Sequence, residues 1–170
     1  IESGAEFSAD STISITSLAA GGTVSFSANS SIGNLTSTGS LSISSTGRIT
    51  VNGNIDGDNS TSSLTVTTPQ GLFLNGSIGQ TSALKNLTIN GHYEPAGGSA
   101  HPITITGDLT ITGDAWLRGD ISAATVNLTS GTSFLSGTNS ITTTGNQTYS
   151  GNYELNNDLT LTSTGGGTVT

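Results

Sequence analysis

Hydrophobic and polar residues alternate in short stretches of this chain, and the same stretch returns at a nearly fixed interval. Leu41-Ser-Ile43 is followed by Leu64-Thr-Val66 and Leu87-Thr-Ile89, each 23 residues further on, and then by Leu109-Thr-Ile111 after 22. An alternation of period two predicts β-strands that bury one face. A repeat of this length is typical of a solenoid, in which each unit buries its apolar side against its neighbours.

A second series runs in step with the first and contains the turns. Its members are Val51-Asn-Gly53-Asn-Ile55, Leu74-Asn-Gly76-Ser-Ile78 and Leu117-Arg-Gly119-Asp-Ile121. Asn and Gly tolerate the left-handed backbone that tight corners need. We therefore expect an all-β chain folded as a parallel β-helix, or β-solenoid, of about 7–8 coils. Each coil would contain roughly 18–23 residues, arranged as three short strands and three corners.

The composition is consistent with this fold. Only 8% of the residues are charged, against roughly 25% in an ordinary globular protein. Hydrophobic residues make up 31%, and Ser, Thr, Asn and Gly fill most of the other positions. These residues are poor helix formers, whereas Thr favours strands and Gly and Asn favour tight turns. We expect almost no helix.

The charge balance argues against several partners. Eleven acidic residues face three basic ones, Arg48, Lys85 and Arg118, which gives a net charge of -8. Without a basic patch, nucleic acid and anionic membrane surfaces are poor partners, and no apolar run approaches the ~18 residues of a membrane span. The absence of Cys suits a secreted protein that is exported unfolded. Because the chain begins and ends inside repetitive sequence, we expect residues 1–170 to be one β-helix segment of a longer protein.

One stretch interrupts the repeat. Residues 92–102 contain both His residues and two of the three Pro residues, and they predict a loop inserted between strands at 87–89 and 103–105. Solenoid insertions often lie on a binding face, so the loop is either a plain surface excursion or a contact for carbohydrate or protein through Tyr93. A metal site built from its His and Glu side chains has no diagnostic ligand spacing, so we expect no metal. The candidate binding residues of this loop are His92, Tyr93, Glu94 and His101.

Two further motifs have a functional and a structural interpretation. Arg118-Gly119-Asp120 spells the tripeptide that integrins read in extracellular ligands, but it occupies the same repeat slot as Asn52-Gly53-Asn54, which predicts an ordinary corner. Asp56-Gly-Asp58-Asn59 is a tight acidic turn that would hold calcium only weakly. Asp in turns more often bonds nearby backbone amides.

Seven Asn-x-Ser/Thr sequons are candidates for glycosylation in a host with the required transferase. In a chain this rich in Asn, Ser and Thr, most of them are expected from composition alone. The candidate residues are Asn29, Asn34, Asn59, Asn75, Asn86, Asn127 and Asn146.

Catalysis has little support in the sequence. Neither His lies in a setting that suggests a nucleophile triad, and glycan-active β-helices need clustered acids with basic residues beside them. We expect no enzyme and no cofactor. Ice binding is a further alternative, because Thr-x-Thr recurs, but the separations of 39, 6 and 50 residues do not fit one coil period. The pairs are Thr65/Thr67, Thr104/Thr106, Thr110/Thr112 and Thr160/Thr162.

The C-terminal run from Ile141 to Val169 and the stretch Ala83-Leu-Lys-Asn-Leu-Thr-Ile89 resemble repeats of very large filamentous-haemagglutinin-like adhesins of Gram-negative bacteria. Together with the β-helical pattern, the likeness extends loosely over nearly the whole chain. The resemblance implies a right-handed parallel β-helix, export by a two-partner (type V) route through an outer-membrane transporter, and a role in attachment or biofilm. The family supplies no catalytic residue that could be carried over.

The hypothesis from sequence is a non-enzymatic stalk and display segment of a secreted adhesin at the bacterial cell surface. Its partner would be a glycan or protein on a host or neighbouring cell, and the segment could self-associate laterally or end to end. The alternatives are a segment of a phage tailspike or fibre, which predicts obligate trimers, a glycan-active β-helix enzyme, and an ice-binding β-solenoid.

Overall fold

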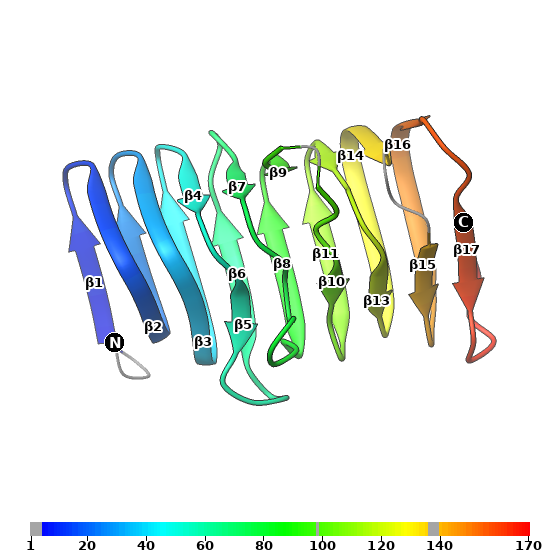
Figure 1. Ribbon diagram of the computed structural model, residues 1–170, viewed down its shortest axis with the longest axis horizontal. Coiled ribbons are helices and arrows are strands. Elements are labelled where there is room, and N and C mark those ends of the chain that lie inside the picture. The colour runs from blue at the N-terminus through cyan, green and yellow to red at the C-terminus, as the bar shows by residue number, and fades with distance from the viewer. Residues whose placement is uncertain (1–4, 98, 136–139) are drawn as a thin grey trace.

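The computed structural model describes residues 5–97, 99–135 and 140–170, and this part of the chain contains strands and turns but no helix (Figure 1). The strands are β1 (Ala5–Ala9), β2 (Ile13–Phe26), β3 (Ser30–Ser45), β4 (Ile49–Val51), β5 (Ile55–Gly57), β6 (Ser63–Thr67), β7 (Leu72–Leu74), β8 (Asn86–Asn90), β9 (Tyr93–Pro95), β10 (Ile103–Thr104), β11 (Asp108–Thr112), β12 (Ala115–Trp116), β13 (Ile121–Ala123), β14 (Thr125–Leu135), β15 (Ser140–Thr143), β16 (Gln147–Leu155) and β17 (Thr160–Ser163).

The described strands pair in parallel and form the three sides of a coil, which we call faces A, B and C. Face A consists of β1, 22–26 of β2, 41–45 of β3, β6, β8, β11, 125–129 of β14 and 147–150 of β16. Face B consists of 13–15 of β2, 30–32 of β3, β4, β7, β9, β12, 132–135 of β14 and 152–155 of β16. Face C consists of 17–20 of β2, 34–37 of β3, β5, β10, β13, β15 and β17.

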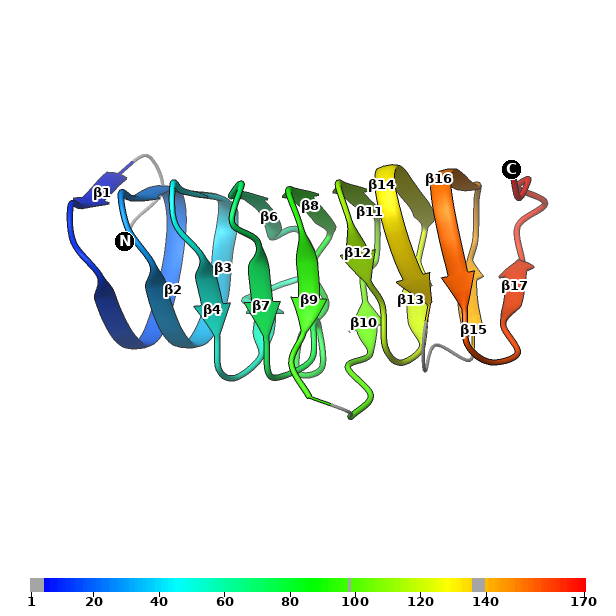
Figure 2. The same cartoon turned by 90° about the horizontal axis from the view of Figure 1, so that it is seen from above.

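The chain passes through faces A, B and C in turn, and about eight such coils stack along the long axis. Strands of the same face lie side by side in neighbouring coils, as β4, β7, β9 and β12 do in Figure 2. The two ends of the chain lie at opposite ends of the stack (Figure 1). The predicted all-β parallel solenoid is therefore confirmed.

The register confirms the first sequence series as one column of face A. Leu64 pairs with Leu87, and Leu87 pairs with Leu109, so the repeated apolar residues lie directly above one another. The length of a coil varies along this column, from 23 residues between Leu64 and Leu87 to 17 between Leu109 and Val126. The corners absorb this difference, because the strands keep their inward and outward alternation throughout.

The inward side chains of all three faces form one continuous core. Leu64, Leu87 and Leu109 of face A are each at most 1% exposed, and Ile55 and Ile78 reach the same interior from face C. Each fully buried aliphatic side chain contributes about 1.5–3 kcal/mol relative to an exposed one. Since one coil alone leaves both rims of its core open, the stack as a whole stabilises the fold.

The predicted loop at 92–102 is only partly a loop. Tyr93–Pro95 form β9, which pairs with β7 on one side, and Tyr93 also pairs with Ala115 of β12 on the other. Pro95 occupies the slot of Val51 and Leu74, so the second sequence series has a member in this coil as well. The prediction of a loop was wrong for residues 93–95, because Pro and Tyr made a regular strand difficult to recognise in the sequence. The loop begins only after β9.

Candidate binding surface on face B

Three aromatic side chains point outward from neighbouring coils of face B. Phe73 lies at the centre of β7, Trp116 ends β12, and Phe134 lies in β14, where it pairs with Trp116. The strand alternation explains this direction, because the residues on either side of Phe73 are buried while Phe73 itself is partly exposed.

His92 fills the gap between these rings, since it precedes β9 in the coil between β7 and β12. The ring centroids of Phe73 and His92 are 5.9 Å apart, those of His92 and Trp116 are 6.1 Å apart, and those of Trp116 and Phe134 are 5.2 Å apart. Consecutive ring planes are tilted by 56°, 81° and 71°. We call Phe73, His92, Trp116 and Phe134 the aromatic row.

Charged groups lie along the aromatic row. The guanidinium carbon of Arg48 is 4.2 Å from the ring centroid of Phe73, in cation–π contact. Nε2 of His92 is 3.3 Å from a carboxylate oxygen of Glu94, and both side chains are about a quarter exposed, at 26% and 28%. Two of the three basic residues of the chain, Arg48 and Arg118, thus lie beside this row.

At the other end of the row a hollow of about 220 Å³ opens between the rings of Trp116 and Phe134, the guanidinium of Arg118 and the side chain of Asn156. Arg118 donates from a terminal guanidinium nitrogen to the carbonyl oxygen of Gly97. Its Nε is buried and has no hydrogen-bond partner in the described part of the chain. The hollow therefore combines two aromatic residues with a guanidinium and an amide side chain.

The structure separates the four residues predicted as one binding loop. His92 and Glu94 face outward on face B, as described above. Tyr93 is 1% exposed and lies in the core, where burial raises the pKa of its hydroxyl. A role for Tyr93 in surface contact is therefore wrong, because the strand alternation that turns His92 and Glu94 outward turns Tyr93 inward.

His101 is built into the wall of the solenoid and is 5% exposed. Its Nδ1 lies 2.6 Å from the carbonyl oxygen of Gly76, and its Nε2 lies 2.8 Å from that of Ala96. Both ring nitrogens are thus engaged by the backbone. Within the described ranges no group of three or more His, Cys, Asp and Glu side chains could hold a metal ion.

Arg118-Gly119-Asp120 forms a corner between faces B and C. The carbonyl oxygens of Arg118 and Asp120 accept hydrogen bonds from the N–H groups of His101 and Ile103, and Asp120 Oδ1 accepts one from the N–H of Ser140. The triplet is thus stacked between the coils on either side of it, in a wall and not in a projecting loop.

The acidic turn at 56–59 also bonds to its surroundings. Asp56 Oδ1 accepts a hydrogen bond of 2.9 Å from the N–H of Thr81, and Asp58 accepts one from the hydroxyl of Ser62. Asn59 Oδ1 accepts one of 2.9 Å from the N–H of Thr61. These side chains brace the turn and the next coil, as turn-forming Asp and Asn residues do.

Most sequon asparagines lie at corners and connect coils. Four of them accept a hydrogen bond through Oδ1 from a backbone N–H of the following coil, namely Asn29 from Arg48, Asn34 from Asn54, Asn86 from Asp108 and Asn146 from Thr168. Asn75 donates from Nδ2 to Asn52 Oδ1 over 3.0 Å. Asn127 Oδ1 is buried without a hydrogen-bond partner in the described part. Whether any of them carries a glycan stays a prediction.

Face A presents a different chemistry, which consists mainly of hydroxyl groups. Its outward residues form two columns that continue from coil to coil. The first column is Thr23, Ser42, Thr65, Thr88, Thr110, Asn127 and Thr148, and the second is Ser25, Ser44, Thr67, Asn90, Thr112, Thr129 and Ser150.

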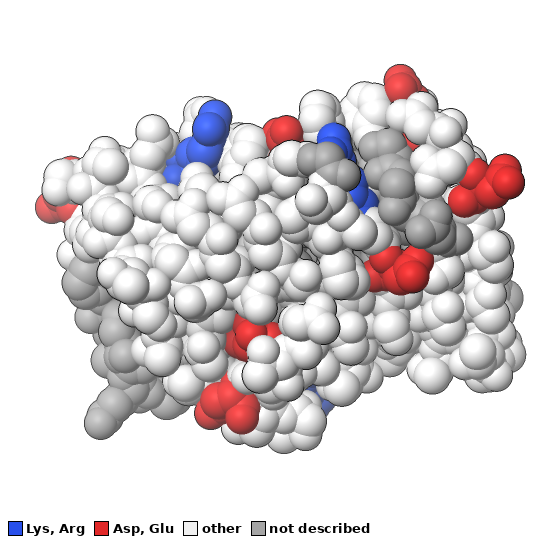
Figure 3. All heavy atoms as spheres, viewed as in Figure 1, with Lys and Arg blue, Asp and Glu red and all other residues white. Residues whose placement is uncertain are grey.

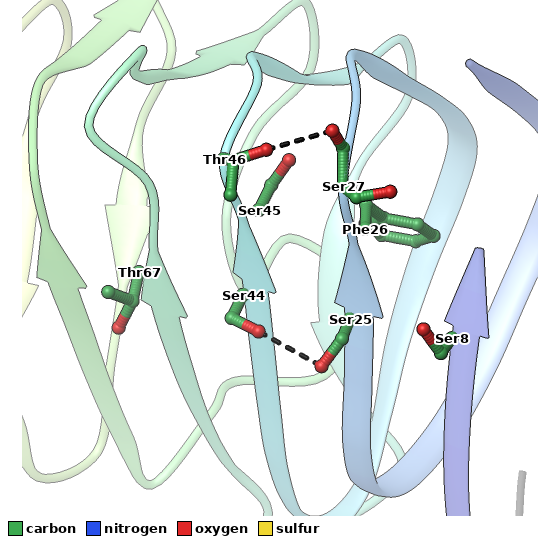
Figure 4. A pocket seen from close by; sticks show the side chains of 8 residues that line it. All are labelled: Ser8, Ser25, Phe26, Ser27, Ser44, Ser45, Thr46 and Thr67. Carbon is green, nitrogen blue, oxygen red and sulfur yellow. Dashed lines mark hydrogen bonds between the residues drawn. The ribbon is translucent and has the colours of Figure 1, made fainter. Parts of the chain in front are cut away.

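Figure 4 shows part of the second column, where Ser8, Ser25, Ser44 and Thr67 follow one another on neighbouring strands. The hydroxyl oxygens of Ser25 and Ser44 are 3.1 Å apart, and Asn90 donates to Thr67 over 3.2 Å. Of the four predicted Thr-x-Thr pairs, Thr65/Thr67 and Thr110/Thr112 lie in these columns, while Thr104 and Thr160/Thr162 belong to face C.

Sequence reasoning missed the aromatic row. A pattern in the sequence could have indicated it. Each ring follows an inward residue in the face B strand of its coil, as is the case for Phe73, Trp116 and Phe134. The chain contains only one Trp and four Phe, so the gathering of three of these residues on one face could have been noticed. The side of the molecule visible in Figure 3 is mostly uncharged, with a few separate acidic and basic groups.

No protein family, curated protein or solved structure matches the chain. Residues 5–97, 99–135 and 140–170 include no helix with the length and apolar character needed to cross a membrane.

Proposed function

We propose that this chain is a rigid, non-enzymatic segment of a bacterial surface adhesin, which supplies reach and displays binding surfaces along its sides. The observation that carries the proposal is the parallel pairing of the described strands, from β1 to β17, around one continuous core. A stack of this kind is a stiff rod whose sides can be decorated without disturbing the interior. The resemblance of its repeats to filamentous-haemagglutinin-like adhesins supports the same role.

The placement of the carboxylates supports a non-enzymatic role. Asp114 and Asp120 each accept a hydrogen bond from a backbone N–H of the next coil, at 2.7 and 3.0 Å. Asp56 does the same at 2.9 Å. Hydrolysis of a glycan needs two carboxyl groups that flank one bond, whereas these acids are distributed among corners and serve the backbone.

Retention of coated beads tests the proposal. Beads that carry the purified chain should be retained on epithelial cells, on bacterial cells or on biofilm matrix, and beads that carry the heat-unfolded chain should not. Equal retention of both bead types on all three surfaces would end the adhesin proposal. Sedimentation of the folded chain as an obligate trimer would favour the tailspike alternative instead.

The hydroxyl columns of face A favour ice binding as a second candidate function. Their strands repeat at about 4.8 Å, and residues two apart along a strand repeat at about 6.7 Å; both spacings are close to oxygen repeats in planes of hexagonal ice. The separations of the Thr-x-Thr pairs along the sequence argued against their alignment on one face of successive coils. The register nevertheless aligns Thr65, Thr88 and Thr110, with Ser and Asn completing the columns.

A thermal hysteresis measurement decides on this second function. If face A binds ice, Thr110→Lys should abolish a hysteresis that the unmodified chain displays, because a long charged side chain prevents close contact with a crystal plane. Thr142→Lys, on the outward side of face C, is the matched control and should leave the hysteresis unchanged. Absence of hysteresis in the unmodified chain would remove this candidate.

A further inference from the structure

Aromatic rings at outward positions are confined to face B within the described residues. Where the structure describes their side chains, faces A and C place Ser, Thr, Asn, Asp or Ala at the corresponding positions. Two of the three faces therefore fold without outward rings, and burying a ring would stabilise the solenoid more than exposing one. Partly exposed rings of Phe73, Trp116 and Phe134, gathered in one line, are typical of a surface that binds a partner.

The shape of the row restricts the class of partner. It is one ring wide and extends over neighbouring coils, from β7 to β14, at centroid distances of 5.2 to 6.1 Å. A protein–protein interface needs a broad patch, which a single line of rings does not provide. A linear glycan has a comparable ring-to-ring repeat and is one ring wide. The apolar C–H faces of its pyranose rings pack against aromatic side chains.

The polar groups beside the row match the hydroxyls of a sugar. Glu94 accepts hydrogen bonds, the amide of Asn156 both donates and accepts, and the guanidinium of Arg118 donates. The hollow of about 220 Å³ between Trp116 and Phe134 is of the size of one pyranose ring.

The charges along the row favour a neutral ligand. Arg48 and Arg118 stand at its two ends, and Glu94 and Glu154 lie on the same face, in β9 and β16. These two positive and two negative side chains leave the row with no net charge. In addition, the chain as a whole carries a charge of -8, which repels polyanions such as sulfated glycans.

We propose that the aromatic row binds a neutral polysaccharide chain that runs along the long axis of the solenoid, with about one sugar ring per coil. This inference rests on the adhesin proposal and names the chemical class of its partner. Trp116 and Phe134 stack on the sugar that enters the hollow, and Arg118 and Asn156 hydrogen-bond to its hydroxyls. His92 and Glu94 contact the next sugars toward Phe73.

Affinity electrophoresis through gels that contain a single polysaccharide tests this inference. The probes are a soluble β-1,4-glucan, a mannan, a galactan and, as a charged comparison, heparin. The folded chain should be retarded by at least one neutral polysaccharide. Trp116→Ala should weaken the apparent affinity on the order of tenfold or more, because it removes a stacking ring, and Trp116→Phe should retain most of it.

Two controls keep the test interpretable. Thr142→Ala, on the outward side of face C, should bind as the unmodified chain does. The urea midpoint of Trp116→Ala should establish that this variant is folded, and Phe134→Ala provides a second truncation of the same hollow if it is not. Retardation by heparin alone, retardation by none of the neutral probes, or equal retardation of the unmodified chain and both truncated variants would overturn the inference.

The outcomes of the two tests are distinguishable. Bead retention that persists in Trp116→Ala, together with no retardation by any neutral probe, overturns the glycan inference and leaves the adhesin proposal standing. Glycan binding that depends on Trp116, without bead retention on any surface, supports the inference about the row and removes the adhesin proposal.

Discussion

Tyr93 is a polar residue placed in an apolar column. It pairs with Leu72 in the preceding coil and with Ala115 in the following one, and the small Ala leaves room for its ring. Its hydroxyl is buried and has no hydrogen-bond partner in the described part of the chain. Leaving such a group unpaired costs about 1–3 kcal/mol, so this position is stabilised by the ring and destabilised by the hydroxyl.

We expect Tyr93→Phe to raise the free energy of unfolding at neutral pH by about 1 kcal/mol, because it removes the unpaired hydroxyl and keeps the ring. Tyr153→Phe is the matched control and should lower it by about 0.5–1.5 kcal/mol, since Tyr153 donates to the carbonyl oxygen of Leu128 over 3.1 Å. Urea unfolding measures both. A loss of stability in Tyr93→Phe would show that the hydroxyl has a partner.

The same residue predicts a loss of stability at high pH. Burial raises the pKa of Tyr93 in the folded chain above its value in the unfolded chain. The part of the free energy of unfolding that depends on a neutral Tyr93 is therefore fully present below the ordinary pKa of about 10, and it is lost as the pH rises through the raised pKa. Urea midpoints of the unmodified chain should fall between about pH 9 and about pH 11. Tyr93→Phe should fall less over this range, and equal losses would contradict the argument.

Gln147 is the polar member of a face A column that otherwise contains apolar residues such as Leu109 and Val126. Its Nε2 donates to the carbonyl oxygen of Thr162 over 2.9 Å, and its Oε1 accepts from the hydroxyl of Tyr149 over 2.7 Å. Gln147→Leu should therefore lower the free energy of unfolding by about 1–3 kcal/mol, although it conserves volume, because it leaves these partners unpaired. An unchanged or higher urea midpoint would contradict this expectation.

At the scale of the elements, the corner between faces A and B depends on stacked glycines. Gly91, Gly113, Gly131 and Gly151 follow one another in neighbouring coils, with φ between 96° and 136°. A Cβ on Gly113 would lie 2.7 Å from the carbonyl oxygen of Gly91, so these corners approach each other too closely for any side chain. The corner at Gly113 joins β11 of face A to β12 of face B, which contains Trp116 of the aromatic row.

Gly113→Ala tests this corner against a matched position. Gly39 also has a positive φ, of 98°, but a Cβ there would meet nothing within 4 Å. Gly39→Ala should cost about 1–2 kcal/mol for the left-handed backbone alone. Gly113→Ala should cost a further ~1–3 kcal/mol for the overlap with Gly91 of the preceding coil. Equal costs in urea unfolding would show that the corners are not closely stacked.

At the scale of the whole molecule, the C-terminal coil leaves apolar side chains open. Leu155, Leu161 and Val169 are 56%, 38% and 45% exposed. Leu161 pairs with Ile141 and Val169 with Gln147, so both continue inward columns at the open end of the stack. Open strand edges with apolar side chains are prone to pair with another chain.

We therefore expect the purified 170-residue chain to self-associate through this coil. Analytical ultracentrifugation should give a mass that rises with concentration, and Leu161→Lys should reduce the association because it places a charge at the open end of the core. Thr142→Lys, on the outward side of face C, adds the same charge elsewhere and should have no effect. Equal association of both variants would contradict end-to-end contact.

Much of the fold could be predicted from the sequence, but less of the binding surface. The column through Leu64, Leu87 and Leu109 could be identified because strand alternation and repeat length are local properties. The row through Phe73, Trp116 and Phe134 could not be identified in the same way. Its members lie 43 and 18 residues apart, and a spacing of that kind has no meaning until the length of each coil is known.

The sequence by itself determined that this chain winds as a β-solenoid and which side chains of its repeated strands turn inward, because backbone pleating reverses side-chain direction at every residue. Only the tertiary structure decided which residues of different coils share a face. The corners take up the differences in length between coils, since paired residues of neighbouring coils lie between 17 and 25 residues apart. The alignment of hydroxyls on face A and of rings on face B therefore follows from the hydrogen-bond register between coils and not from separation along the chain.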